Sequence, residues 1–84
     1  MLKMPAPLSN IRAAFALVQQ TGHQAEMAAR NLKQAEIQLM NALETQLIDV
    51  ALRISYYKEI MEENRIAQAK YQHASDMLYH LMTF

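Results

Sequence analysis

The residues of this chain best suited to chemistry are two histidines and an aspartate near its end. His73, Asp76 and His80 are spaced i, i+3 and i+7, so on a helix they share one face. Imidazole and carboxylate groups are common ligands of zinc and iron, and this spacing offers half of a site that another helix would complete. The competing interpretation is a solvated polar edge. We favour the polar edge and expect no metal and no cofactor, because such coincidences are frequent on helices.

No arrangement typical of catalysis is legible in the sequence. Cysteine is absent, and no Ser/His/Asp set with a recognisable spacing occurs. A phosphate-cradling loop needs several glycines, whereas the chain has only Gly22. The Glu-x-x-His pattern of di-iron bundles is missing too. We therefore expect a protein that is not an enzyme, with no catalytic, cofactor-binding or metal-binding residues.

The amino-acid composition limits the kinds of partner that this protein is expected to bind. Lys plus Arg number 8 and Asp plus Glu number 8 in 84 residues, so the formal net charge is zero. Nucleic-acid binding is disfavoured, because it usually requires a basic excess on one face. No apolar run is long enough to span a membrane, and Pro5, Pro7, Asn10 and Arg12 interrupt any signal-peptide core. We expect a cytoplasmic protein, or one exported without a cleavable signal.

The elements that must position these residues are helical. Residues 1–8 are predicted to form an extended leader, because Pro5 and Pro7 disfavour helix there. Residues 9–84 are predicted to form a single all-helical domain. Ser9 or Asn10 is a good N-cap for a short helix over 9–20. Gly22 then predicts a break, although a glycine inside a continuous helix costs only about 1 kcal/mol relative to alanine.

Beyond Gly22 the sequence predicts a long helix, straight or bent, with candidate bends at residues 55–57 and 62–64. An apolar stripe repeats along it by threes and fours: Ala25, Ala28, Ala29, Leu32, Ala35, Leu39, Leu43, Leu47, Val50, Ile54, Tyr57 and Met61. The fold class is all-α, a helical hairpin or long-helix bundle completed by oligomerisation, because a chain this short cannot cover so broad a stripe.

Two groups of residues are the predicted interface. The first group is the centre of the stripe. The second is the apolar final segment of the sequence, because a tail that contacts nothing is usually polar. Together they are Leu39, Leu43, Leu47, Val50, Ile54, Leu78, Leu81, Met82 and Phe84. Four tyrosines and seven methionines suit either an interface or ordinary packing. A ridge of alanines from Ala25 to Ala42 suits either close helix contact, for example across a dimer axis, or simply the high helix propensity of alanine at positions that face nothing in particular.

In architecture alone, the chain resembles the short cysteine-free helical hairpins of secretion systems, such as needle subunits, their co-chaperones and small type VII substrates. The type VII Trp-x-Gly turn and the mid-chain proline turn of needle subunits are both absent. The sequence predicts an interaction protein that binds itself and another protein, with a secretion-system or phage accessory protein or chaperone as concrete versions. The alternatives are a small regulator, such as an inhibitor or antitoxin, and a metal-binding helical bundle.

Overall fold

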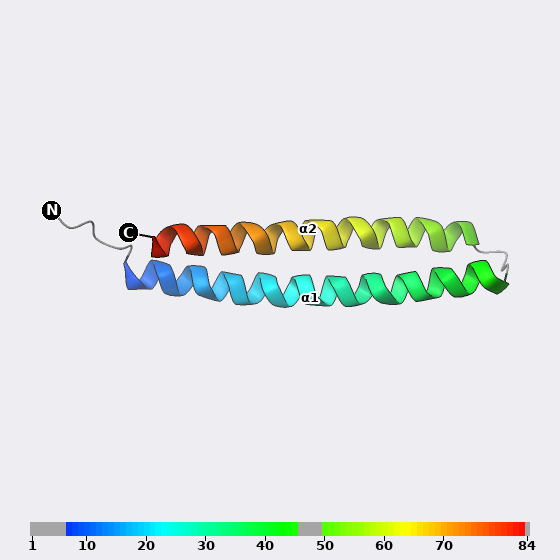
Figure 1. Cartoon of the computed structure of the whole chain (residues 1–84), viewed down its shortest axis with the longest axis horizontal. Helices are drawn as coiled ribbons and strands as arrows, with labels where there is room; N and C mark the ends of the chain where they lie inside the picture. Colours follow the sequence, from blue (N-terminus) through cyan, green and yellow to red (C-terminus); the bar gives the residue numbers. More distant parts are fainter. Residues whose placement is uncertain (1–6, 46–49, 84) are drawn as a thin grey trace.

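The computed structural model describes residues 7–45 and 50–83, which form two long antiparallel α-helices. Helix α1 spans Leu8–Thr45 and helix α2 spans Val50–Met82. They lie side by side along their whole lengths, so the beginning of α1 and the end of α2 are at the same end of the molecule (Figure 1). The result is a narrow rod, 15 × 14 Å in cross-section. The all-α hairpin expected from the sequence is confirmed. Over the described residues, neither helix has a stretch apolar enough to cross a bilayer.

Helix α1 is continuous through Gly22, so the predicted short helix over 9–20 and the break after it are wrong. A Cβ atom at Gly22 would lie 3.1 Å from Cε1 of Tyr71 on α2. The missing side chain therefore gives the Tyr71 ring its place against α1. Close packing between the helices accounts for this glycine, where the sequence suggested a helix end.

The start of α1 also differs from the expectation. The carbonyl oxygen of Pro7 accepts hydrogen bonds from the backbone N–H groups of Asn10 at 2.9 Å and Ile11 at 3.1 Å. The helix therefore begins at Leu8, and Ser9 and Asn10 lie in its first turn rather than at its cap. Of the predicted leader, residues 1–6 lie outside the described residues.

Helix α2 is likewise uninterrupted, so the candidate bends at residues 55–57 and 62–64 are wrong. The chain reverses direction between Thr45 and Val50. That interval contains neither glycine nor proline, which explains why no turn was expected there. Residues 46–49, including Leu47, lie outside the described residues.

The two helices meet along a seam in which residues recur at intervals of three and four, the pattern of a two-stranded coiled coil. All the seam residues are buried or half-buried except Tyr71, which is 39% exposed. On α1 they are Ile11, Ala14, Val18, Thr21, Ala25, Ala28, Leu32, Ala35, Leu39 and Ala42. On α2 they are Val50, Arg53, Tyr57, Ile60, Asn64, Ala67, Tyr71, Ala74, Leu78 and Leu81.

Small residues predominate on the α1 side of this seam, and larger ones on the α2 side. Every second seam residue of α1, from Ala14 to Ala42, is alanine or threonine, which lets the helices approach closely and interdigitate. Two hydrogen bonds fix their relative height: Gln68 Nε2 donates to the Ala25 carbonyl at 2.9 Å, and Arg53 donates to Gln38 Oε1 at 3.2 Å. The alanine ridge thus serves close contact within the hairpin.

The core of the hairpin is thin. Among the described residues, seven apolar side chains are buried and five of them are alanines, with Ile60 and Leu78 as the two larger ones. Alanine buries little area, and the hydrophobic stabilisation is roughly proportional to the area removed from water. Most of the large apolar side chains of this chain therefore remain partly in contact with solvent.

Candidate interaction surface

Within the hairpin, the polar trio of His73, Asp76 and His80 does not gather into a group that could hold a metal ion by itself. His73, Asp76 and His80 are all exposed. Asp76 accepts a hydrogen bond from Gln72 Nε2 at 3.0 Å, and the His80 ring meets that of Tyr79 edge-on with centroids 6.0 Å apart. Within residues 7–45 and 50–83, no three His, Cys, Asp or Glu side chains come together in a way that could hold a metal ion.

The predicted interface residues fall into three groups. Four lie on the seam between the helices and are buried or half-buried: Leu39, Val50, Leu78 and Leu81. Three lie beside the seam and are 37–50% exposed: Leu43, Ile54 and Met82. Two lie outside the described residues: Leu47 and Phe84. The exposed group is the one still able to contact another molecule.

These exposed residues belong to a continuous row on each helix. The members of a row are seven residues apart, each at the position immediately after one of the alternate seam residues. In an antiparallel pair of helices, the two rows defined in this way flank the seam on the same side. We call the two rows the apolar flank. On α1 they are Leu8, Phe15, Gly22, Ala29, Glu36 and Leu43, and on α2 they are Ile54, Met61, Gln68, Ser75 and Met82. The contacts of Gly22 with Tyr71 and of Gln68 with Ala25 confirm that both rows border the same side of the seam.

The apolar flank exposes large side chains toward both ends of the rod, with Met61 between them. Leu8 is 78% exposed, and Phe15, Leu43, Ile54, Met61 and Met82 range from 37% to 51%. Glu36 is the one charged member of the two rows. Partly buried apolar side chains with so little charge between them are typical of a surface that another molecule covers.

The opposite side of the seam is more polar, and we call it the mixed flank. Its α1 row is Asn10, Leu17, Gln24, Asn31, Gln38 and Thr45, and its α2 row is Tyr56, Glu63, Lys70 and Met77. One open hollow there, of about 240 Å³, is lined by Gln24, Met27, Ala28, Asn31, Ile60 and Glu63. Another, of about 320 Å³ near the ends of the described chain, is lined by Asn10, Ala13, Ala14, Leu17, Met77 and Leu81. Neither lining combines a nucleophile with a base.

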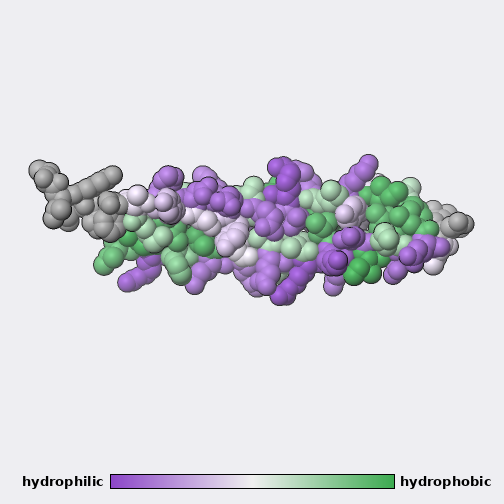
Figure 2. All heavy atoms as spheres, in the orientation of Figure 1, coloured by the Kyte–Doolittle hydropathy of each residue, from purple (hydrophilic) through white to green (hydrophobic). Residues whose placement is uncertain are grey.

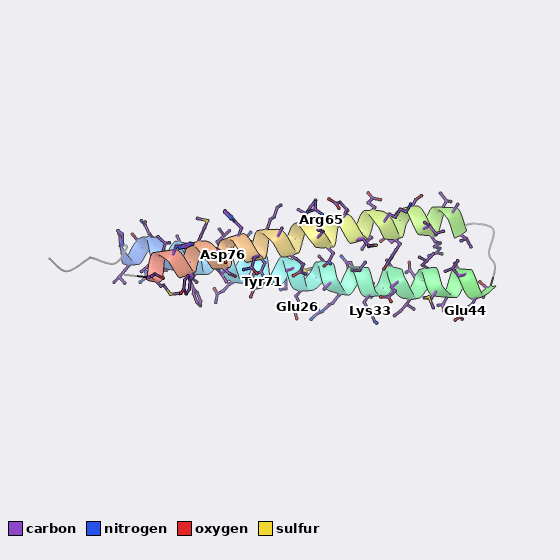
Figure 3. The ribbon with its side chains drawn as sticks, turned by 45° about the horizontal axis from the view of Figure 1, so that its top comes forward. Glu26, Lys33, Glu44, Arg65, Tyr71 and Asp76 are labelled. Atoms are coloured by element: carbon purple, nitrogen blue, oxygen red, sulfur yellow. The ribbon has the colours of Figure 1, made fainter. Side chains whose placement is uncertain are left out.

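Charged residues border the apolar flank on its outer edges (Figure 3). On α1, Glu26 Oε1 lies 3.1 Å from the Arg30 guanidinium. On α2, Arg65 Nε donates to Glu62 Oε2 at 3.0 Å, with a second bond between the same side chains. The hydrogen bonds from Arg65 lower the pKa of the Glu62 carboxyl. Both pairs are exposed, so they contribute little to stability but give each edge a mixed charge pattern.

The sequence interpretation missed Leu8 and Phe15 as surface residues. Leu8 falls in the predicted leader over 1–8, and Phe15 in the predicted short helix over 9–20. The signal that would have found them is the seven-residue spacing of Leu8, Phe15, Gly22 and Ala29, read with Gly22 inside the helix. Tyr57, which was placed on the stripe, is half-buried on the seam, whereas its neighbour Tyr56 is 49% exposed.

Comparison with known proteins adds no relative: the chain matches no protein-family model, no curated protein and no solved structure.

Proposed function

We propose that this protein is a non-enzymatic assembly protein, which acts by packing the apolar flank of its hairpin against helices of another polypeptide. That polypeptide is a second copy of the chain or a different protein with an apolar helix. A secretion-system or phage accessory protein, or a chaperone that caps an apolar helix, is a concrete version of this role. The function requires no cofactor and no catalytic residue.

The observation that carries the proposal is the contrast between a thin core and a long exposed flank. Five of the seven buried apolar side chains are alanines, while Phe15, Leu43 and Met61 remain about half exposed. Covering a half-exposed side chain of this size contributes about 1 kcal/mol, since full burial of a large apolar side chain contributes about 1.5–3 kcal/mol. Covering the flank would therefore supply stability that the hairpin alone lacks. Helix-in-groove packing is the usual way for proteins to bury such a surface.

A matched pair of substitutions tests the proposal. Leu43 on the apolar flank is 50% exposed, and Ile37, on the same helix but outside both flanks, is 51% exposed. Leu43→Lys is expected to reduce the size of the native assembly, measured by mass spectrometry of the intact complex and by sedimentation. Ile37→Lys is expected to leave it unchanged. A wild-type protein that sediments as a monomer and co-purifies with nothing would refute the proposed function, as would equal effects of the two substitutions.

A further inference from the structure

Large and small side chains are distributed unevenly along the apolar flank. Near the start of α1 and the end of α2 it carries Leu8, Phe15 and Met82, and near the chain reversal it carries Leu43 and Ile54, with Met61 nearer the middle of the rod. Between the two ends lie the small or amide side chains Gly22, Ala29, Ser75 and Gln68, and the charged Glu36 lies between Met61 and Ile54. Figure 2 shows a side of the rod with this character, on which hydrophobic residues gather toward both ends and hydrophilic residues between them. An occupant of the flank must therefore be apolar at both ends and carry mostly small or polar side chains along the stretch between them.

We infer that the occupant is a second copy of this chain, docked flank to flank about a twofold axis that runs along the rod. The inference rests on the proposed function and names its partner. In this arrangement α1 of one copy lies on α2 of the other, and both chain reversals are at the same end. Each apolar end then covers the equivalent end of the second copy, as an isologous interface requires.

The size of the flank is sufficient for a stable dimer. Helix α1 has 38 residues, and at a rise of about 1.5 Å per residue it is about 57 Å long. The rod is 15 Å across, so a flank of this length covers about 850 Å² on each copy, against about 800 Å² per partner in a standard specific interface. A single partner helix would cover only part of this width.

Charge complementarity selects the direction of the second copy. Gln68 bonds to Ala25, which places Arg65 within about one helical turn of the height of Glu26. With the twofold axis along the rod, Glu26 of each copy meets Arg65 of the other at both outer edges. Glu36 of one copy similarly comes to the height of Lys58 of the second copy. Their attraction offsets the repulsion between Lys58 and Lys33, which also come close together in this arrangement. With the axis across the rod, Glu26 would instead face Glu26, and Arg65 would face Arg65.

The first experiment measures whether the apolar flank holds two copies together. Met61 on the flank is 46% exposed, and Met27, at nearly the same height on the other side of the rod, is 48% exposed. In sedimentation equilibrium at micromolar concentration, we expect a dimer for the wild type. Met61→Lys is expected to raise the dimer dissociation constant by about tenfold or more, the equivalent of about 1.4 kcal/mol, and Met27→Lys by less than about threefold. Circular dichroism of both variants checks that the helices remain.

The second experiment measures the direction of the two copies. Because the chain has no cysteine, Glu44→Cys provides one labelling site, exposed and close to the end of α1. Spin labels on the two copies are expected about 20–30 Å apart, as neighbouring helices are spaced by about 10 Å and labels project outward from them. Copies related by an axis across the rod would place the labels about 55 Å apart at 1.5 Å per residue.

The outcomes separate this inference from the proposed function. A dimer weakened by Met61→Lys, with the short label distance, supports the inference. A label distance near 55 Å, a larger oligomer, or an assembly in which a different protein covers the flank overturns it while leaving the proposed function in place. A wild type that is monomeric and binds no other protein overturns both.

Discussion

Replacing Gly22 by alanine sets two effects of similar size against each other. Alanine is favoured over glycine inside a helix by about 1 kcal/mol. Its Cβ atom, however, would lie 3.1 Å from Cε1 of Tyr71 and 3.5 Å from Cδ1, so the ring must move by a few tenths of an ångström. Tyr71 is 39% exposed and can tilt outward, at a cost of about 0.5–1 kcal/mol if its torsion leaves the preferred range. We therefore expect Gly22→Ala to change the free energy of unfolding by less than about 0.5 kcal/mol.

Removing the Tyr71 ring should reveal the stabilisation that alanine provides over glycine at residue 22. In a Tyr71→Ala background nothing crowds residue 22, and Gly22→Ala is expected to stabilise by the full value of about 1 kcal/mol. Tyr71→Phe keeps the ring and should behave as the wild type does. The difference between backgrounds is the coupling energy of a double-mutant cycle, expected at about 0.5–1 kcal/mol.

Urea denaturation followed by circular dichroism at 222 nm supplies the four free energies. All variants must be measured at one protein concentration, because self-association would add a concentration-dependent term to the stability. If Gly22→Ala stabilises the wild type and the Tyr71→Ala variant equally, the ring does not press on residue 22, and the explanation of the continuous helix through this glycine fails.

Three further perturbations test other parts of the hairpin. Leu78→Ala, at one of the two large buried side chains, should lower the free energy of unfolding by about 2–4 kcal/mol, whereas Leu52→Ala, at a side chain that is 73% exposed, should change it by less than about 0.5 kcal/mol; similar values would misplace the seam. Ala35→Leu should destabilise by about 1–3 kcal/mol in the same assay, because Ala35 is 4% exposed and a larger side chain would push the helices apart; a neutral result would contradict the close approach. Arg65→Gln should raise the pKa of Glu62, because hydrogen bonds from Arg65 hold that pKa below its usual value of 4.5. Since the pKa of Glu62 is lower in the folded than in the unfolded protein, the small stabilisation from this pair is present at neutral pH and is lost as the pH falls through the folded pKa. An NMR titration of Glu62 that is unchanged by the substitution would contradict this prediction.

The helical class and part of the seam could be predicted from the sequence. Residues from Val18 to Leu39 contain no strong helix breaker apart from one glycine, and Leu32, Leu39, Val50 and Tyr57 were placed on the packed stripe and lie on the seam. Their spacing is set by the geometry of the helix alone, which is why reading it needs no knowledge of the partner helix.

The position of the turn and the phase of the stripe could not be predicted. A single stripe was read through residues 25–61, but the chain reverses between Thr45 and Val50, and each helix starts its own repeat. Leu43, Ile54 and Met61 consequently lie beside the seam rather than on it. Gly22 was misread because its cost of about 1 kcal/mol in a helix is local, whereas the Tyr71 ring that uses its missing side chain is 49 positions away in the sequence.

A seam that repeats every seven residues allows the two helices to align in more than one register. The packing of Tyr71 against Gly22 distinguishes between these registers. Small residues recur along α1 from Ala14 to Ala42, so sliding α2 by one repeat would preserve much of the pattern of small against large. Such a slide would bring Tyr71 from Gly22 to Phe15 or Ala29, both of which carry the Cβ atom that Gly22 lacks. The single glycine therefore favours the alignment that places Tyr71 beside it over others with similar apolar contacts, by about the 0.5–1 kcal/mol that displacing the ring costs.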